Sequence, residues 1–343
     1  MSTSGSMSSL LELSSALSPD TRLYRTMDFF GAAAMHTGRQ LMFTRADKFE
    51  DRNEGIDLLL TQLELTHPNS GCGMGWTDAT SAREQHALVK HSHYISCWSR
   101  NAESVAMWSL YSPDFCSVRV STTVAKLLVP VESLLTKYSL GRLTGDDVGN
   151  RVVIATGARI EPVTYASLSD IMFRVNRRAK ARIRLHGRYE RTGRKMPTPQ
   201  EINPRYWERE QQRRLSELRT TCTLKDASFA HEAEVRLTVR LGEEPCHQIV
   251  LDRELPLLDP AHEYHTLLAS DLKAWGWVKT SSIPEREFAP CAASLIDSVA
   301  IDPRCPPHKA AFMRRWFEEH GIAVGNSTCF GYLPDSFSVF PYR

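Results

Sequence analysis

The sequence lacks the motifs of several common enzyme classes. It contains no G-x-S-x-G nucleophile elbow, no G-x-x-x-x-G-K-[ST] phosphate loop, no G-x-G-x-x-G dinucleotide fingerprint and no H-E-x-x-H zinc motif. It also has no run of about 18 apolar residues, the minimum for a membrane-spanning helix. These absences argue against α/β-hydrolases, P-loop proteins, Rossmann dehydrogenases and zincins, and against a membrane partner.

Cysteine pairs of the C-x-x-C type are absent as well, although the chain has eight cysteines. His91 with His93, and Cys246 with His247, lack a second pair at zinc-finger spacing. A chain of 343 residues can bury a core without disulfides. We therefore expect reduced thiols, no metal, and a location in the cytoplasm, either of the producing cell or of a target cell into which the protein is delivered.

The N-terminal segment has neither the basic region nor the apolar region of a signal peptide, and it is rich in serine. We expect residues 1–20 to be a disordered leader.

Lysine is scarce: ten lysines stand beside 32 arginines, and the net charge is only +2. Between Arg174 and Arg219 there are fifteen basic and five acidic residues, so this segment carries +10 and the remainder −8. Arginine suits phosphate, and Tyr189, Tyr206 and Trp207 could stack on bases. The segment is either a polyanion-binding surface or a solvated helical insertion with Glu–Arg pairs; a membrane-surface helix would need a stronger apolar stripe. The candidate nucleic-acid or anion contacts are Arg177, Arg178, Arg182, Arg213 and Arg214.

Short strands and helices alternate without a regular βαβ order. Strands are expected at 22–25, 41–44, 94–99, 116–121, 151–165, 232–241 and 296–301. Helices are expected at 29–35, 104–111, 168–186, 204–219 and 306–320. This pattern predicts an α+β fold with a central mixed or antiparallel sheet, in which 21–343 form one domain and 168–219 a helical insertion.

Four motifs in order resemble an uncharacterised bacterial family, the domain of unknown function twenty-nine seventy-one. The first is Leu23-Tyr24-Arg25, and the second is the acidic loop Phe49–Glu54. The third is the strand that contains Ser96, followed by Met107-Trp108-x-x-Tyr111. The fourth is Lys225 followed by Glu232-Ala233-Glu234-Val235-Arg236. The stretch Ile296–Pro303 also fits. The resemblance covers roughly 22–325, and the acidic loop departs from the family pattern by its missing Asn and Pro.

The order of Arg, Ser and Glu-x-Glu is also similar to that of the R-S-E class of ADP-ribosyltransferases. This resemblance implies NAD as substrate and a sheet split around a cleft. The nicotinamide–ribose bond breaks through an oxocarbenium-like state, which a carboxylate stabilises, and the pyrophosphate needs a cation such as arginine. Glu232 and Glu234 would share one face if both lie on one strand.

The resemblance implies specific roles at five polar positions. Glu234 would be the catalytic carboxylate, and Glu232 would activate or orient the acceptor. Arg25 would bind the phosphates, and Ser96 or Ser99 would supply the hydroxyl of the middle strand. The alternative is that Glu-x-Glu and Arg25 belong to solvent-facing strand surfaces.

Aromatic residues would enclose the nicotinamide, and Tyr24, Trp98 and Trp108 are the candidates. Trp108 and Tyr111 lie three residues apart beside Met107, however, a spacing that is equally typical of core packing.

The sequence thus predicts an NAD-consuming ADP-ribosyltransferase or NAD glycohydrolase of toxin, effector or phage-defence type, with a protein, a nucleic acid or water as acceptor. The main alternative is a non-enzymatic RNA- or anion-binding module that uses the Arg-rich insertion. A metal-dependent nuclease built on Asp47, Glu50, Asp51 and Glu54 would lack a catalytic lysine on an adjacent strand.

Overall fold

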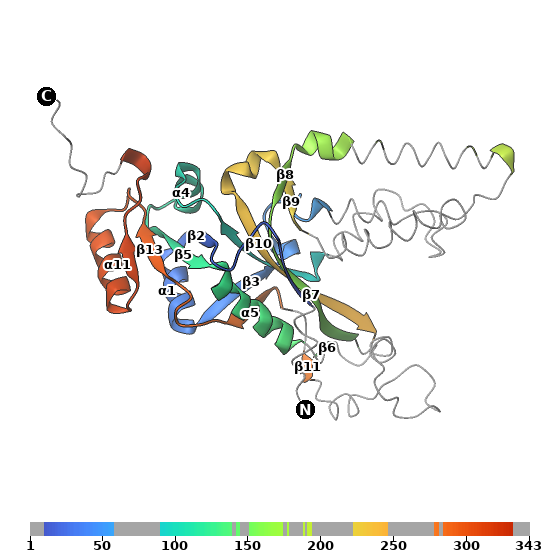
Figure 1. Ribbon diagram of the computed structural model, residues 1–343, viewed down its shortest axis with the longest axis horizontal. Coiled ribbons are helices and arrows are strands. Elements are labelled where there is room, and N and C mark those ends of the chain that lie inside the picture. The colour runs from blue at the N-terminus through green and yellow to red at the C-terminus, as the bar shows by residue number, and fades with distance from the viewer. Residues whose placement is uncertain are drawn as a thin grey trace.

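The computed structural model describes residues 10–57, 90–138, 142–144, 151–173, 177, 188, 191–193, 222–245, 278–280 and 284–331 (Figure 1). It is an α+β fold built on a mixed sheet of twelve strands, with a second sheet of two short strands. The expected class and the mixed character of the sheet are confirmed. Among the described residues, no helix combines the length and apolar character needed to cross a bilayer.

The large sheet follows the order β11-β6-β7-β10-β4-β2-β5-β13-β14, with β1 beside β7 and with β3 joining β12 to β4. The strands are β1 (Leu11–Leu13), β2 (Arg22–Asp28), β3 (Gln40–Arg45), β4 (His93–Ser99), β5 (Ser117–Thr123), β6 (Arg142–Thr144), β7 (Arg151–Pro162), β8 (Thr164–Ala166), β9 (Leu224–Asp226), β10 (Glu234–Pro245), β11 (Val278–Thr280), β12 (Arg286–Pro290), β13 (Ser298–Ile301) and β14 (Ala323–Gly325). The α-helices are α1 (Phe29–Gly38), α4 (Val105–Tyr111), α5 (Val124–Lys137) and α11 (Pro307–Glu319). Three 3-10 turns complete the described elements: η1 (Ala46–Lys48), η2 (Ala227–Glu232) and η3 (Cys329–Gly331).

The hydrophobic core lies between the sheet and the helices, and α5 crosses the sheet in Figure 1. Leu127, Val131 and Leu134 of α5 are spaced three or four residues apart and are at most 1% exposed, so they form one apolar stripe. Sequence analysis did not predict α5, which contains Pro130. A proline costs a helix one backbone donor and a steric clash, and the burial of this stripe offsets that cost.

α1 shows how local sequence sets an element boundary. The Asp28 carboxylate accepts a hydrogen bond from the Gly31 N–H at 2.7 Å, which satisfies one of the free donors of the first turn. The last residue of the helix is Gly38. Arg39, which follows it, adopts a left-handed conformation (φ 49°) and ends the helix.

Two parts of the chain differ from the sequence-based expectation. Residues 11–13, expected in the disordered leader, instead form β1 and pair in parallel with β7, and Leu17 is buried in the core. β10 begins at Glu234, so Glu232 lies in η2 and not on the strand.

The expected helical insertion is only partly described. Residues 168–173 are helical, and so are Arg177, Arg188 and Arg191, all three of which are exposed. Arg178, Arg182, Arg213 and Arg214 lie outside the described residues. β8 and β9, which precede and follow this stretch, pair with each other in parallel, and Tyr165 lies opposite Lys225.

Candidate functional site

The large sheet divides at β4. One edge of β4 pairs with β10 along its whole length. The other edge pairs with β2 only at Tyr24–Ser99, and with β3 only at Thr44–Ile95 and Arg45–Tyr94. β2 then leaves β4 and continues beside β5. A cavity of about 600 Å³ lies at this division, a size within the usual range of ligand pockets.

The cavity walls come from segments far apart in the sequence. β2, β4, β9 and β10 contribute, together with α4, η2 and the loop after β3. Figure 1 places α4 and η2 at the same edge of the sheet, next to β10 and β2. The order β10-β4-β2 is therefore what brings the predicted Arg, Ser and Glu positions together.

Arg25 contributes a positive charge to the cavity wall. Its Nη1 donates a hydrogen bond to the Ser96 hydroxyl at 3.3 Å, and no described carboxylate forms an ion pair with it. Burial lowers the pKa of Arg25, an effect that Cys97 and Tyr111 partly offset. A guanidinium remains protonated in proteins nonetheless, so Arg25 is a cation with capacity for an anionic ligand.

Glu232 and Glu234 point to the same ammonium group. Lys225 Nζ lies 2.6 Å from Glu232 Oε2 and 3.3 Å from Glu234 Oε2. Ala233, between the two glutamates, adopts a left-handed conformation with φ 43°. The two carboxylates converge because the chain turns at this left-handed residue. The expectation that Glu232 and Glu234 lie on the same face of one strand was wrong.

Glu234 does share a face of β10 with Arg236, two residues further on. Arg236 Nε lies 2.8 Å from Glu234 Oε1, and Arg236 Nη2 lies 2.9 Å from Glu54 Oε2. Arg236 Nη1 also donates to Glu54 and to the carbonyl of Cys222. With 1% exposure, Arg236 is a buried ion-pair residue, so the solvent-facing interpretation of this strand was wrong at this position.

This pairing sets the charge of Glu234. Burial acts to raise its pKa, but the charge and hydrogen bond of Arg236, with help from Lys225, lower the pKa to about 2. Glu234 is therefore ionised at every physiological pH. Cys97 hydrogen-bonds Glu234, and burial followed by the charge of Glu234 raises the pKa of the Cys97 thiol, which stays protonated.

Three hydroxyl groups hold the backbone and side chains of the two glutamates. The Tyr111 hydroxyl donates to Glu232 Oε1 at 2.8 Å, and the Ser99 hydroxyl donates to the Glu232 carbonyl at 2.6 Å. The Glu234 N–H donates to the Tyr165 hydroxyl at 2.8 Å. Burial and the Glu232 charge raise the pKa of Tyr111, so this phenol remains a neutral donor.

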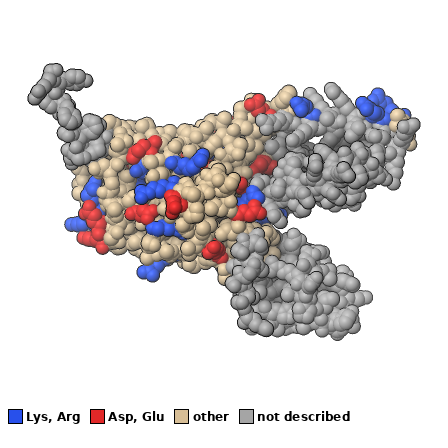
Figure 2. Space-filling view, viewed as in Figure 1, with Lys and Arg blue, Asp and Glu red and all other residues tan. Residues whose placement is uncertain are grey.

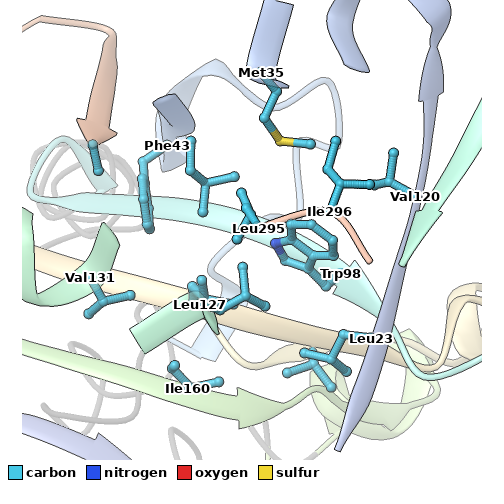
Figure 3. Packing of buried hydrophobic residues seen from close by; sticks show 14 of the residues in the cluster. Leu23, Met35, Phe43, Trp98, Val120, Leu127, Val131, Ile160, Leu295 and Ile296 are labelled. Atoms are coloured by element: carbon cyan, nitrogen blue, oxygen red, sulfur yellow. The ribbon is translucent and has the colours of Figure 1, made fainter. Parts of the chain in front are cut away.

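The two tryptophans are core residues. Trp98 is 2% exposed, and its ring packs among Leu23, Leu295 and Ile296 (Figure 3). Trp108 is 1% exposed, does not line the cavity, and donates from Nε1 to the Ser327 hydroxyl at 3.2 Å. Trp98 nevertheless lines the cavity, as expected for the aromatic wall, whereas Trp108 does not.

Three further aromatic side chains line the cavity, together with the predicted Tyr24 and Trp98. They are Phe49, Tyr111 and Phe229. The Lys225 ammonium lies 4.3 Å from the centre of the Phe229 ring. Sequence reasoning missed Phe229 and Tyr165. It considered Glu54 only as part of the acidic loop and of the metal-dependent nuclease alternative, and not as a partner of Arg236.

The lining charges divide into two groups. Lys225 and Arg236 form ion pairs with carboxylates, whereas Arg25 has no such partner in the part of the chain that the structure describes. Glu54, Glu232 and Glu234 contact these cations, which disfavours a metal ion beside them, and the described residues contain no cluster of three or more metal-ligating side chains. The cavity thus has one arginine without a described ion-pair partner and, separately, a group of carboxylates that contact Lys225 and Arg236.

Six of the eight predicted catalytic and ligand-binding residues line the cavity: Tyr24, Arg25, Trp98, Ser99, Glu232 and Glu234. Ser96 is buried and reaches the site through its bond with Arg25. The chain matches no protein-family model, no curated protein and no solved structure.

Proposed function

We propose that this cavity binds NAD and cleaves the bond between nicotinamide and ribose, passing ADP-ribose to water or to an acceptor molecule. The observation that carries the proposal is that Arg25, which forms no ion pair with a described carboxylate, and the Glu232–Glu234 pair lie in one cavity of about 600 Å³. NAD has a negative pyrophosphate and a positive pyridinium. It therefore needs the two kinds of charge that the cavity walls offer.

Arg25 would bind the pyrophosphate. A guanidinium can donate two parallel hydrogen bonds to phosphate oxygens, which fixes the orientation of the ligand. The bond to Ser96 would hold the guanidinium in place while its remaining donors face the ligand. In this role Ser96 positions Arg25 and does not itself react.

Glu234 would stabilise the positive charge that develops on the ribose. Its charge is shared with Arg236 and Lys225, but Glu54 also binds Arg236, and Glu232 also binds Lys225. Three carboxylates and two cations leave one net negative charge on the cluster. A fixed negative charge in a half-enclosed site favours an oxocarbenium-like state over the uncleaved substrate.

Glu232 would act on the nucleophile. As the bond between C1′ and the pyridinium nitrogen breaks, nicotinamide leaves as a neutral molecule with the bonding electron pair. The oxygen or nitrogen of the acceptor then bonds to C1′, and its proton passes to Glu232, which Tyr111 and Lys225 hold in position.

The family resemblances extend this proposal in two directions. They suggest an ADP-ribosyltransferase-like arrangement of the sheet around the cavity. They also suggest a toxin, effector or phage-defence role in a cytoplasm, where NAD is available. Neither suggestion is needed for the chemistry proposed at the cavity.

Release of nicotinamide from NAD by the purified protein tests the proposal. Glu234→Gln removes the charge while preserving size, and we expect it to lower the rate by roughly 100- to 1000-fold. Glu319→Gln on the exposed side of α11 is the matched control and should leave the rate unchanged. Absence of nicotinamide release and of NAD binding by the wild type would refute the proposal.

A second candidate function is RNA or anion binding by the Arg-rich insertion. Arg177, Arg188 and Arg191 are exposed, whereas basic and acidic side chains are interspersed over the described part of the face seen in Figure 2. Binding through the insertion would weaken steeply as salt rises, because phosphate contacts release counterions. Arg177→Gln and Arg191→Gln should reduce that salt-dependent binding and leave NAD cleavage intact.

A further inference from the structure

Two cysteines from distant parts of the chain lie beside each other, away from the cavity. Cys116 directly precedes β5, and Cys305 lies between β13 and α11. β5 and β13 are paired, and past their end the Asp302 N–H donates to the Ser117 carbonyl at 3.1 Å. The Cys305 N–H in turn donates to the Asp302 carbonyl at 2.9 Å. This turn brings Cys305 next to Cys116, and the proximity of Cys116 contributes to the raised pKa of the Cys305 thiol.

Cys116 is the accessible member of the pair. It is partly exposed, and the Lys309 ammonium in the first turn of α11 lies 3.4 Å from its sulfur. A cation at this distance stabilises negative charge on the sulfur, and the thiolate is the reactive form of cysteine. The Cys116 thiol also contacts the Asp114 carbonyl at 3.3 Å.

Cys305 has the opposite surroundings. It is 8% exposed, and burial, followed by the proximity of Cys116, raises its pKa to about 12. Cys305 therefore remains a protonated thiol next to an accessible sulfur that has a cation beside it. An exposed reactive cysteine with a neighbouring second thiol is the arrangement of redox-responsive sites.

We propose that Cys116 and Cys305 form a reversible dithiol–disulfide site that is oxidised by peroxides. The Cys116 thiolate attacks one peroxide oxygen, the O–O bond breaks, and the departing hydroxide takes up a proton to give water. The Cys305 sulfur then attacks the sulfenic sulfur of Cys116. The S–O bond breaks, and the hydroxyl leaves with the Cys305 proton as a second water. The two thiols lose two electrons, the peroxide gains two, and a dithiol reductant reverses the change.

Peptide mapping of the full chain tests this proposal. The protein is treated with one equivalent of hydrogen peroxide, alkylated and digested. We expect a linked peptide pair containing Cys116 and Cys305, which disappears after treatment with dithiothreitol. Cys291 is the internal control, since it is also partly exposed but has no described cation contacting its sulfur, and it should stay reduced.

Two variants separate the steps. Cys305→Ser should leave Cys116 as a sulfenic acid that dimedone traps, because the second thiol is missing. Lys309→Met on the surface should slow the oxidation about threefold, because it removes the cation that lies beside the reacting sulfur.

Three results would overturn the proposal. One is equal reactivity of Cys116 and Cys291 toward peroxide, and another is a disulfide from Cys116 to any cysteine other than Cys305. The third is an unchanged oxidation rate in Lys309→Met, a variant that keeps both thiols and the fold.

Discussion

The two faces of β10 differ in how they are buried. Val235, Leu237 and Val239 enter the hydrophobic core and are fully buried. Glu234 and Arg236, on the opposite face, are also almost fully buried, but in a network of ion pairs. Apolar burial stabilises the fold directly, whereas a buried ion pair gains little over apolar side chains and costs much when one partner is lost. One strand thus anchors the fold on one side and holds the ion-pair network of the candidate site on the other.

The sharpest way to break this comparison is to remove the central cation. Arg236→Met leaves Glu54 and Glu234 buried without their partner, and we expect the free energy of unfolding to fall by about 3–5 kcal/mol. Chemical denaturation monitored by circular dichroism measures the change. A loss below about 1 kcal/mol would mean that the network contributes little to folding.

Leu237→Ala is the matched change on the apolar face. It should cost a similar amount, about 2–5 kcal/mol, through lost burial and the cavity it leaves. At a temperature where the variant remains folded, however, it should keep the NAD affinity of the wild type, because Leu237 does not line the cavity.

The pH dependence of stability sharpens the comparison, because two acids of the ionic region have opposite shifts. Burial raises the pKa of Asp57 from 3.8 to about 6, although hydrogen bonds from Thr223 and Cys222 oppose the shift. Stability from a raised pKa is present below the unfolded value and is lost as pH rises through the folded value. Asp57 should therefore cost stability above about pH 6, and Glu234 should lose its contribution only as pH falls from about 4.5 toward 2.

Asp57→Asn isolates the first of these effects. Relative to this variant, the wild type should become more stable by roughly 1–3 kcal/mol as pH falls from 7 to 4. Parallel curves for the two proteins over that range, measured by urea denaturation, would contradict the assignment.

The smallest expected effect is at Ala233. Its left-handed conformation suits glycine, so Ala233→Gly should change stability by no more than about 1 kcal/mol, in the stabilising direction. Ala233→Val, with a branched side chain, should instead destabilise the protein by about 1–3 kcal/mol. Thermal melts of both variants check the sign, and two equally destabilised variants would argue against the left-handed turn.

Sequence reasoning identified elements that have a strong local pattern. The alternation of Val235, Leu237 and Val239 was sufficient to predict β10. It did not reveal that Glu232 precedes the strand, because alanine at 233 carries no signal for a left-handed conformation. α5 was missed although its apolar stripe is regular. The helix contains Pro130, and proline is unfavourable in the interior of a helix.

The site was predictable where its residues fit an ordered motif, and not where it depends on distant contacts. Arg25 and Glu234 were found from such a motif. The partner of Arg236, Glu54, is 182 residues away, so local sequence could not distinguish a buried ion pair from a solvent-facing arginine. Trp108 was misassigned because an aromatic side chain has the same pattern in a core as in a ligand pocket.

The parallel pair β8–β9 has a consequence for how the chain can vary in length. Tyr165 and Lys225 lie opposite each other in this pair. Tyr165 contacts Glu234, and Lys225 contacts both Glu232 and Glu234. The Leu168 N–H donates to Asp226 at 2.8 Å. The stretch between residues 174 and 221 therefore departs from and rejoins the protein at two points that are fixed to each other. We therefore expect that a short linker can replace this stretch while the positions of Tyr165 and Lys225 beside the glutamates are retained.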